Sequence, residues 1–565
     1  MARFRFHGDD YSVQGCDRQG VDEMGREMVK RWQKTHVAFD IAAYEAPLTA
    51  IIEAVRAEED FTWRALQRIL HRYPRDGDRV FSKDQLVLGY RALCTAGRFP
   101  FEREVLRRLQ MKPVRTASGV APVAVLTKPY PCPGRCIFCP DDARMPKSYL
   151  HDEPGAMRAE LNEFDPYRQV ASRIESLEAI GHTTDKVELL ILGGTWSAYP
   201  KGYQEWFVRR CLDAMNGRES ASLEEAQRLN EDAPHRNVGL VIETRPDWIS
   251  PAEVRWLRRL GVTKVQLGAQ SLDDRILALN RRGHTVETTR HAVRLLRLAG
   301  FKLHLHWMPN LLGATPESDL ADFRRLWDDP ALRPDELKIY PTALLRNTEL
   351  YRHWENGEYQ PYTREALIGL LVACKAMVPR YCRLNRVIRD IPAGHIVAGN
   401  KESHLRQVVQ AEMRRQGLRC QCIRCREVGQ EEVRPETLHL EEMGYDTDIT
   451  EERFLSFVTP QDRLAAFLRL SLPRDRSASA ELLAELRDCA MIREVHVYGP
   501  ALGIGSESMG EAQHLGLGRR LIQRAAEIAR AEGYGHLAVI AAIGTRRYYR
   551  RLGFEPRGSY MVRPL

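Results

Sequence analysis

The sequence predicts an α/β protein built around a parallel, partly closed barrel and followed by a second, smaller α/β domain. Its 565 residues exceed what one hydrophobic core usually supports. Six runs rich in β-branched residues alternate with helical stretches, a pattern typical of βα units around a parallel sheet. The runs cover residues 120–127, 186–195, 237–246, 264–271, 302–311 and 336–342. A further set of strands around one helix occupies residues 445–565.

Composition excludes two classes of protein. No run of about 18 apolar residues occurs, so we expect neither a signal peptide nor a membrane span, and we expect a cytoplasmic protein. Twelve cysteines are too few for a disulfide scaffold in so long a chain, and their clustering favours metal binding in a reducing compartment. The net charge of +8 permits an acidic partner such as nucleic acid but does not require one.

Residues 1–115 carry helical patterns, for example over 47–56 and 61–72, and end in a basic stretch. That stretch contains Arg103, Arg107, Arg108, Lys112 and Arg115 against Glu102 and Glu104. Such a helix end could lie along the phosphates of a nucleic acid. A solvated helix face of ordinary charge density is an equally good interpretation.

A cysteine loop follows the first predicted strand. In KPYPCPGRCIFCP, residues 128–140, the thiols of Cys132, Cys136 and Cys139 have the spacing C-x3-C-x2-C. Three thiolates can hold three irons of a [4Fe-4S] cluster and leave the fourth iron open, the arrangement of radical S-adenosylmethionine (SAM) enzymes. Structural zinc is the alternative, together with three unrelated buried cysteines. Zinc would need a fourth ligand close by, and none follows Cys139 closely.

Later strands end in tips that fit a SAM site at the same carboxyl edge of the barrel. Gly193 and Gly194 would let backbone approach the methionine end of SAM, and Glu243 would bond its ribose or amino group. Gln270 and Ser271 would face the same cavity. Each tip alone is weak, because Gly-Gly after a strand is usually a turn.

A second group of cysteines lies in the connecting segment 381–444. Cys420, Cys422 and Cys425 stand in CQCIRC, and Cys382 could supply a fourth thiolate for a tetrahedral structural zinc site. Reduced thiols without a ligand are the alternative.

The segment 445–565 has strands over 454–458, 464–470, 492–498 and 537–543, with an amphipathic helix before the last strand. Gly516 and Gly518 leave backbone amides exposed at the start of that helix, a ready site for pyrophosphate. The Q-x-x-G-x-G pattern from Gln513 to Gly518, placed between two strands, is similar to the acetyl-coenzyme A (acetyl-CoA) signature of GNAT acetyltransferases.

Together these motifs resemble the Elongator catalytic subunit family in its single-chain bacterial or archaeal form. The resemblance covers about residues 80–565, through VRTASGVAPVAV, KPYPCPGRCIFCP, DKVELLILGGT, IETRPD, RGHTV, LKIYPT, REVHVYG, TRRYYRRLGF and YMVRPL. It implies a radical SAM partial (βα)6 TIM-like barrel over 116–380, a GNAT domain over 445–565 and a helical, tRNA-binding extension over 1–115.

The implied function is carboxymethylation of carbon 5 of the tRNA wobble uridine, an acyltransferase-class reaction. A radical from SAM would take hydrogen from the acetyl methyl group of acetyl-CoA, the carbon radical would add to uridine, and water would cleave the thioester. This scheme requires the GNAT site to open onto the barrel mouth. The implied partners are the tRNA anticodon stem-loop and an electron donor; a homodimer is left open.

The resemblance also implies roles for single residues. Cys132, Cys136 and Cys139 would hold the cluster. Acetyl-CoA would be bound by three sets of residues. They are the strand Glu494, Val495, His496 and Val497, the residues near its pyrophosphate, Gln513, Gly516, Leu517, Gly518 and Arg519, and Tyr549 near the thioester. Tyr548 could serve instead of Tyr549, and a buried aromatic pair is the alternative for both. Lys186 matches a family position toward acetyl-CoA, although we expect it at the strand end opposite the cluster.

Two other functions remain open at this point. The protein could be a lysine acetyltransferase with a structural iron-sulfur domain, or a nucleic-acid-binding assembly subunit whose motifs are relics. The first would not depend on SAM, and the second would not turn over acetyl-CoA.

Overall fold

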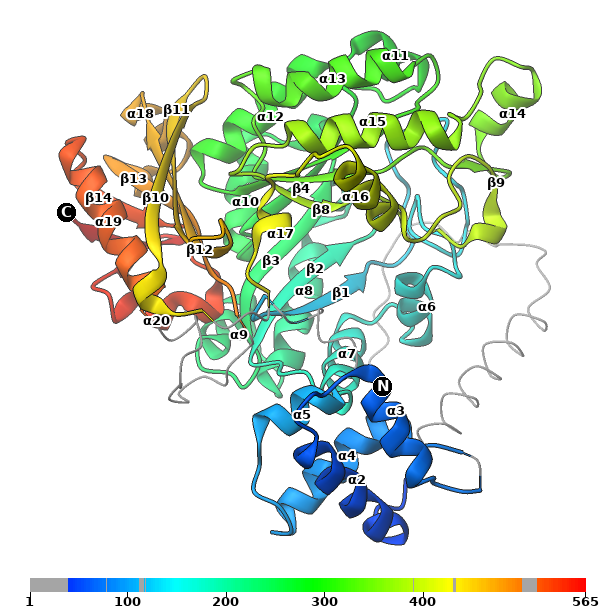
Figure 1. The fold of residues 1–565 in the computed structure, drawn as a ribbon. Helices are drawn as coiled ribbons and strands as arrows, with labels where there is room; N and C mark the ends of the chain where they lie inside the picture. The colour runs from blue at the N-terminus through cyan, green and yellow to red at the C-terminus, as the bar shows by residue number, and fades with distance from the viewer. Residues whose placement is uncertain are drawn as a thin grey trace. The chain divides into compact units, whose positions relative to one another are not determined.

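The computed structural model describes residues 39–77, 79–110, 116, 118–389, 391–429, 433–499 and 516–565. The chain divides into two compact units, Met1–Arg108 and Leu109–Leu565, and each is described by itself. Figure 1 shows the elements of both units.

The described part of the first unit is helical, as predicted. Its elements are η1 (Ala42–Tyr44), α2 (Glu45–Ala57), α3 (Trp63–Arg72), α4 (Lys83–Thr95) and α5 (Arg103–Leu109). Apolar side chains such as Leu48, Ile52 and Leu66 are buried between the helices.

Two of the basic residues expected to meet phosphates serve the helices themselves. Arg108 Nη1 donates to the carbonyl oxygens of Val55 at 2.7 Å and Glu58 at 2.6 Å, the unpaired end of α2. Arg107 and Arg108 also pair with Glu104 on α5. Lys112 and Arg115 lie outside the described residues, and tRNA binding by this region stays a prediction.

The second unit begins with a seven-stranded, wholly parallel sheet of order β1-β2-β3-β4-β5-β6-β8. Its strands are β1 (Ala121–Leu126), β2 (Lys186–Leu192), β3 (Arg236–Thr244), β4 (Lys264–Gln270), β5 (Lys302–Trp307), β6 (Glu336–Ile339) and β8 (Arg383–Arg386). β1 and β8 each pair on one side only, so the barrel is partial. The predicted six strands are confirmed. The seventh was missed because RLNR is polar and only Leu384 is buried in it.

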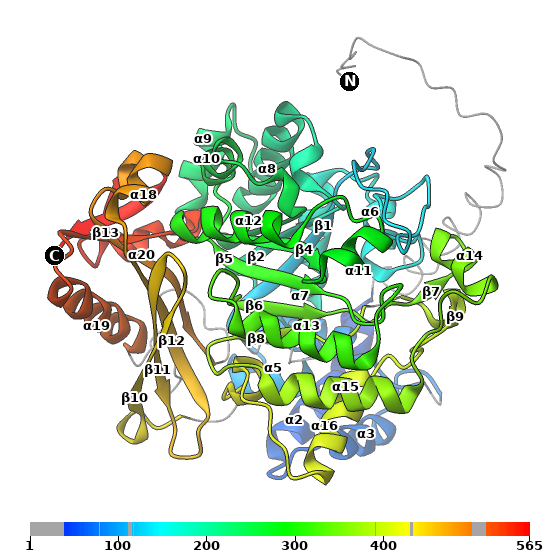
Figure 2. The same cartoon turned by 90° about the horizontal axis from the view of Figure 1, so that it is seen from above.

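Helices cover the outer face of this sheet (Figure 2). They are α6 (Pro154–Leu161), α7 (Pro166–Ala179), α8 (Lys201–Asn216), α9 (Leu223–Asn230), α10 (Pro251–Leu260), α11 (Asp274–Leu279), α12 (Val286–Leu298), α13 (Pro316–Asp328) and α15 (Arg364–Met377). Between β6 and β8 the chain also forms β7 (Leu344–Leu345) and α14 (Glu349–Glu355). After β8 come β9 (Ile396–Ala398), which pairs with β7, then α16 (Leu405–Arg415) and α17 (Ile423–Arg426).

A second seven-stranded sheet forms the C-terminal domain, in the order β10-β11-β12-β13-β14-β16-β15. Its elements are β10 (His439–Asp446), β11 (Thr450–Val458), β12 (Leu464–Pro473), α18 (Arg476–Leu482), β13 (Cys489–Val497), α19 (Leu517–Ala531), β14 (His536–Val539), η9 (Ile543–Thr545), α20 (Arg546–Arg550), β15 (Glu555–Arg557) and β16 (Tyr560–Pro564). The predicted strands and helix are confirmed. β10 was missed because its residues alternate between exposed and half-buried, without an apolar run.

β13 and β14 are parallel neighbours that separate partway along. Their pairing ends at Ile492 opposite Val539, and β13 continues to Val497 without β14 beside it. The result is a V-shaped gap whose arms are β13 beyond Ile492 and the segment after β14. The backbone amides of β13 that line the gap can pair with an extended ligand.

The C-terminal domain packs against the amino ends of the barrel strands. Arg493 on β13 donates to both carboxylate oxygens of Asp335, at 2.6 Å each, and also to Phe301 O at 3.0 Å. Asp335 and Phe301 directly precede β6 and β5. Although burial opposes ionisation, Arg493 and Arg469 hold the pKa of Asp335 well below its usual value. The contact is therefore a fully buried, hydrogen-bonded ion pair.

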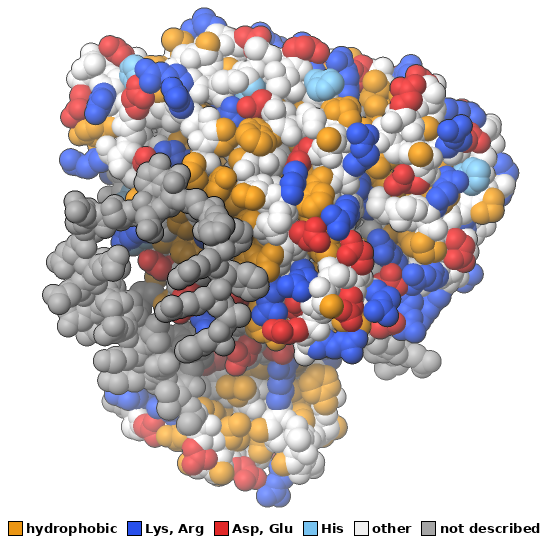
Figure 3. Space-filling view, turned by 180° about the vertical axis from the view of Figure 1, so that it is seen from behind, with side chains coloured by type: hydrophobic (Ala, Val, Ile, Leu, Met, Phe, Trp, Pro, Cys, Tyr) orange, Lys and Arg blue, Asp and Glu red, His pale blue; other side chains and the backbone are white. Residues whose placement is uncertain are grey.

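Basic and acidic side chains are interspersed over much of the face shown in Figure 3, in keeping with the small net charge of +8.

Among the described residues, every helix is too short or too polar to cross a membrane.

We predict that Asp335→Asn lowers the free energy of unfolding by about 3–5 kcal/mol, because buried Arg493 loses its two-point carboxylate partner and retains only the pair with Glu452 among the described residues. Urea unfolding followed by circular dichroism measures the loss. Asp446→Asn, which breaks an exposed pair with Arg474, is the matched control and should cost less than about 1 kcal/mol. Equal losses in the two variants would show that the buried pair of Asp335 and Arg493 stabilises the fold no more than an exposed pair does.

Candidate active site

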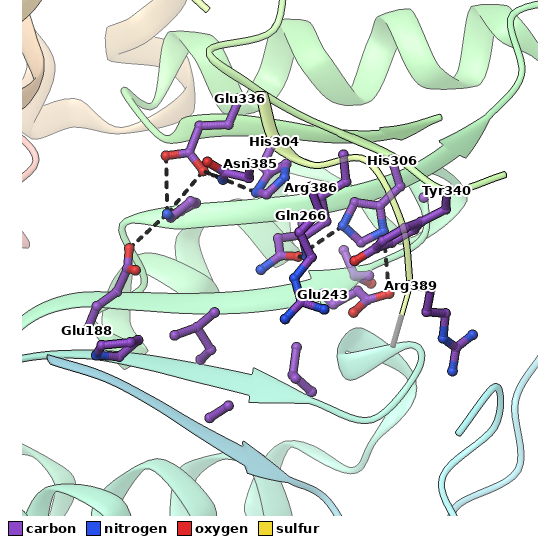
Figure 4. Close-up of a pocket in the computed structure, with 18 of the residues that line it drawn as sticks. Glu188, Glu243, Gln266, His304, His306, Glu336, Tyr340, Asn385, Arg386 and Arg389 are labelled. Atoms are coloured by element: carbon purple, nitrogen blue, oxygen red, sulfur yellow. Dashed lines mark hydrogen bonds and ion pairs between the residues drawn. The ribbon is translucent and has the colours of Figure 1, made fainter. Parts of the chain in front are cut away.

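One cavity of about 850 Å³ is lined by residues of both the barrel and the C-terminal domain. It reaches from the cysteine loop at the carboxyl ends of the barrel strands to β13 and the segment after β14 at their amino ends. Figure 4 shows side chains in its middle part.

The three cysteines of the first motif line the carboxyl end of this cavity, as predicted. The Gly134 N–H donates to Cys132 Sγ at 3.4 Å, and Arg282 Nη1 donates to Cys136 Sγ at 3.4 Å. Burial, and next the neighbouring Cys136, raise the pKa of Cys139 to about 12. N–H donors directed at sulfur suit thiolates that carry an anionic cluster, so the residues present fit a [4Fe-4S] group.

Near the cysteine loop, two of the buried polar atoms without a hydrogen-bond partner among the described residues are an open donor and an open acceptor. They are Arg245 Nη1 and Gln270 Oε1. Arg245 is held by Asp247 and by Arg282 O, and it approaches the loop so closely that a Cβ on Gly134 would lie 2.3 Å from Nη1. A buried donor and a buried acceptor left open fit a polar ligand such as SAM.

The strand tips divide into those that line the cavity and those that do not. Gly194, Glu243 and Gln270 line it. Gly193 lies behind it, where its oxygen accepts from Tyr199 and a Cβ would meet Thr127 Oγ1 at 1.8 Å. The expectation that Ser271 faces the cavity is wrong, because its hydroxyl donates to buried Asp322 at 3.2 Å on the helix side.

Ionic side chains form a girdle around the amino half of the cavity (Figure 4). Lys264 Nζ lies 2.8 Å from Glu188 Oε1 and 3.2 Å from Glu336 Oε2. Asn385 Nδ2 donates to Glu336 at 2.6 Å, and His304 Nδ1 lies 3.2 Å from the same carboxylate. Burial would lower the pKa of Lys264, but the two carboxylates reverse that effect and raise it.

A second polar group lies nearer the cysteines. His306 Nε2 is hydrogen-bonded to Gln266 Oε1 at 2.9 Å. Its other ring nitrogen, Nδ1, lies 3.6 Å from Glu243 Oε1. Burial raises the pKa of Glu243, with Lys338 and Arg389 opposing it. Tyr340 and Arg389 complete this part of the wall (Figure 4).

Sequence reasoning predicted Glu243 but missed the other wall residues, although a signal was present. Side chains of a strand alternate between two faces, and a parallel sheet covered on both faces is normally apolar throughout. β5 instead reads KLHLHW, with His304 and His306 toward the cavity and Leu303 and Leu305 toward the helices. β4 and β6 alternate in the same way, with Lys264, Gln266, Glu336 and Lys338 facing inward. Polar residues at every second position thus indicate a hydrated interior.

The V-shaped gap forms the end of the cavity that lies at the C-terminal domain, opposite the cysteine loop. Glu494, Val495 and His496 line it from β13, and residues 539–542 line it after β14. Val495 and Val497 also pack toward α19, since a Cβ on Gly518 would lie 3.8 and 3.7 Å from them. Glu494 lies beside Lys302 and accepts from Arg469 at 2.9 Å.

The two tyrosines lie differently. Tyr549 is 7% exposed and lines the cavity, whereas Tyr548 is 42% exposed with its hydroxyl 3.0 Å from a Cβ on Gly518. The rings contact each other edge to face at 5.3 Å. Tyr548 is therefore at the start of α19 and Tyr549 at the gap.

Helix α19 begins directly after Gly516, and the anion site expected at its start stays a prediction. Gly516 has φ 69° and precedes α19, with Leu517 buried and Arg519 exposed. Gln513 lies outside the described residues.

Lys186 is the first residue of β2 and pairs in register with Arg236. Gly544 of η9 packs on Arg236, with a Cβ position 2.6 Å from Arg236 Cβ. Lys186 therefore lies beside the C-terminal domain and opposite the cysteines, as expected. The expectation that the GNAT site opens onto the barrel mouth is wrong, because the C-terminal domain covers the other end and meets the cysteine end through the interior.

Helix α20, which carries Tyr549, is held by an acidic residue of the barrel domain. Glu231 forms ion pairs with Arg546 at 3.4 Å and with Arg550, and neighbouring Asp232 pairs with Arg547. Glu231 is only 11% exposed at its side chain, so these pairs are partly shielded from water.

The second cysteine group is compact. The sulfur atoms of Cys420, Cys422 and Cys425 all lie within 4.8 Å of one another. The prediction that Cys382 completes the set is not met, because its thiol lies outside that group although its oxygen accepts from Ile423 N at 3.0 Å. Lys375 Nζ and Gln410 Nε2 approach Cys425 Sγ at 3.8 and 3.6 Å.

Family comparisons cover most of the second unit. Residues 130–324 match the Radical SAM superfamily, residues 334–415 match the Radical_SAM C-terminal domain, and residues 425–554 match the Acetyltransferase (GNAT) family.

Full-length relatives share both domains. The chain is 45% identical to a tRNA uridine(34) acetyltransferase of Dehalococcoides mccartyi, over 80% of this chain and 99% of that one. It is 37% identical to Elongator complex protein 3 of Homo sapiens, over 82% and 88%. Among solved structures, archaeal Methanocaldococcus infernus Elp3 lacking residues 1–46 aligns with a TM-score of 0.68 and 41% identity, over 79% of this chain and 100% of that one.

We predict that Glu231→Gln speeds amide hydrogen exchange in α20 by about tenfold or more, because charge-assisted hydrogen bonds of this kind contribute roughly 1.5–3 kcal/mol. Hydrogen exchange with mass spectrometry measures the change. Glu205→Gln, which breaks a more exposed pair with Arg259, should leave α20 unchanged. Unaltered exchange in Glu231→Gln would mean that α20 is held by packing alone.

Proposed function

We propose, since the chain belongs to the family of tRNA uridine(34) acetyltransferases and Elongator complex protein 3, that it modifies the wobble uridine of tRNA. The product would be 5-carboxymethyluridine, made from acetyl-CoA in an acyltransferase-class reaction. The observation that carries the proposal is the single cavity lined by the cluster cysteines and by the β13 strand of the GNAT domain. A reaction that joins both cofactor chemistries needs such a shared space.

Each bound group has a stated contribution. When bound, the [4Fe-4S] cluster and SAM would supply a 5′-deoxyadenosyl radical able to take hydrogen from an acetyl methyl group. Cys132, Cys136 and Cys139 would hold the cluster. The open hydrogen-bond positions at Arg245 and Gln270, with Glu243 and Gly194 near them, would orient SAM.

Acetyl-CoA would lie in the V-shaped gap. Backbone amides of β13 beyond Ile492 would pair with its pantetheine arm, and the amides at the start of α19 would bind its pyrophosphate. Lys186 lies at the same end of the barrel as these groups. Tyr549 would contact the thioester from α20.

The interior path makes the geometry demanding. A strand of seven residues such as β2 spans about 20 Å, so an acetyl group entering at one end must extend inward to meet a radical formed at the other. The girdle of Lys264, Glu188 and Glu336 would form the wall of that path.

The lysine acetyltransferase alternative fits this arrangement less well. A peptide lysine must reach the thioester from outside, whereas the barrel-facing side of the gap opens into the barrel interior. The relic alternative leaves the donors around Cys132 and Cys136 without a purpose. The tRNA anticodon stem-loop, the electron donor, a homodimer and a cytoplasmic location stay predictions.

The reconstituted protein, incubated anaerobically with a reductant, tRNA, SAM and methyl-labelled acetyl-CoA, should give labelled 5-carboxymethyluridine in nucleoside mass spectrometry. Cys136→Ala should abolish the product because it removes a cluster ligand. Tyr549→Ala should reduce it about tenfold or more, and Cys94→Ala is the matched control with full activity. Label on protein lysines without SAM would contradict the proposal and favour the acetyltransferase alternative.

We also propose that Cys420, Cys422 and Cys425 bind a structural zinc ion. Three thiols this close are a ligand set that Zn²⁺ accepts, with the fourth position supplied by a group other than Cys382. The site would join the barrel to the β10 side of the C-terminal domain, since Arg463 donates to Cys425 O at 3.2 Å.

Purified protein should contain about one zinc per chain by elemental analysis, in addition to cluster iron. Cys422→Ser should remove that zinc and leave the iron in place, whereas Cys211→Ser should retain both metals. Zinc retained in Cys422→Ser would contradict the site.

A further inference from the structure

One arm of the V-shaped gap is the part of β13 beyond Ile492. This arm, together with the residue directly after it, presents three polar side chains to the barrel. Glu494, His496 and Tyr498 all line the cavity, and they alternate with Val495 and Val497. Glu494 is neutralised by Lys302 and Arg469. Tyr498 is buried, and its hydroxyl accepts from Arg383 at 2.7 Å. His496 is half-buried, and it is the member of this row that carries a basic ring nitrogen without a hydrogen-bond partner among the described residues.

The hydrogen bond of His496 fixes its tautomer. Its Nε2 lies 3.1 Å from the backbone oxygen of Ser118. A carbonyl oxygen only accepts, so Nε2 carries the proton and Nδ1 carries the lone pair. No described residue bonds Nδ1. Rings of Tyr498 and Phe467, at 4.4 and 5.9 Å, hold the imidazole plane.

His496 is also electrically neutral near pH 7. Burial lowers its pKa to about 4, and although Glu494 opposes this effect, Lys302 and Arg383 add to it. A neutral imidazole with an oriented N–H and a free lone pair is the form that accepts a proton from water.

From this placement we infer that His496 is the general base that activates water for the thioester cleavage that ends the proposed reaction; the inference rests on the proposed function. His496 belongs to the arm of the gap that β13 forms, and the other arm and Tyr549 line the same cavity, so a thioester lying in the gap would face the space that its ring lines. The Ser118 carbonyl oxygen accepts from Nε2 and so orients the imidazole, as the third residue of a hydrolytic triad orients its histidine.

The step balances without an oxidant or a reductant. Nδ1 of His496 takes a proton from water while the water oxygen bonds the thioester carbonyl carbon. The carbon–sulfur bond then breaks, the sulfur leaves with the proton from the imidazolium, and the new carboxylic acid loses its proton to solvent. The products are a carboxymethyl group on the nucleoside and free coenzyme A.

Other acid-base groups of the cavity are less suited. Glu188 and Glu336 are bound by Lys264, and Glu494 by Lys302 and Arg469. His304 has its Nδ1 3.2 Å from Glu336, so that nitrogen is already directed at a carboxylate. Tyr549 is protonated at neutral pH because burial raises its pKa further above the usual value.

The test uses His496→Gln in the full-length reconstituted protein. Glutamine retains an N–H donor for Ser118 O but has no basic lone pair. We expect the release of free thiol, followed with a chromogenic disulfide, to fall about 100-fold, in line with the usual contribution of a general base. The dissociation constant for acetyl-CoA should change less than about threefold, and 5′-deoxyadenosine should still form.

Two further readouts separate a base from a structural role. An acid-quenched digest of the tRNA should contain uridine joined to coenzyme A through the uncleaved thioester, identified by mass spectrometry. Added hydroxylamine, which attacks thioesters without a base, should restore thiol release in His496→Gln. His439→Gln, on the exposed edge strand β10, is the matched control and should behave like the wild type.

Thiol release within about threefold of the wild type in His496→Gln would overturn the inference. So would a fall in thiol release matched by an equal loss of acetyl-CoA binding, since that would make His496 a binding residue only. Failure of the proposed function is a separate result, because the wild-type protein would then give no labelled nucleoside at all.

Discussion

The buried pair of Asp335 and Arg493 is the interaction on which the arrangement of the two chemistries depends. It joins the start of β6 to the middle of β13, and Glu452 and Arg469 surround it within the same core. A charge that is fully removed from water needs its counter-ions in place, so neither partner can shift without a large cost. The pair therefore fixes β13 across the amino ends of the barrel strands. The barrel-facing side of the V-shaped gap consequently opens into the barrel interior.

The interior has to be polar for the same geometric reason. A partial barrel whose interior is one cavity from end to end is not filled with apolar side chains, as a closed barrel of this size would be. Lys264 pairs with Glu188 and Glu336 along the wall, Lys302 also pairs with Glu336, and Asn385 donates to Glu336 Oε2. Buried charges that are mutually paired keep the cavity open without leaving an isolated ion.

The placement of the GNAT domain also explains how a fold used for acyl transfer would end in hydrolysis. On β13 the side chains toward α19 are Val495 and Val497, whereas Glu494 and His496, with Tyr498 directly after the strand, line the barrel cavity. An acetyl group in the gap would thus face a cavity wide enough for water and for a substrate from the other end. The barrel domain in turn holds α20, and with it Tyr549, through Glu231. Each domain therefore completes the site of the other.

The sequence by itself determined the elements and the chemistry carried by short motifs. The spacing of Cys132, Cys136 and Cys139, the alternation of six strands with helices, and the glycines before α19 all depend on residues close together in the chain, whose geometry local rules describe. Only the tertiary structure decided which end of the barrel the C-terminal domain covers, because that depends on contacts such as Asp335 with Arg493, 158 residues apart. It likewise turned Ser271 toward Asp322, left Cys382 outside the thiol group and gave β8 its place beside β6. These outcomes follow from packing between distant segments, on which the local pattern of each segment carries no information.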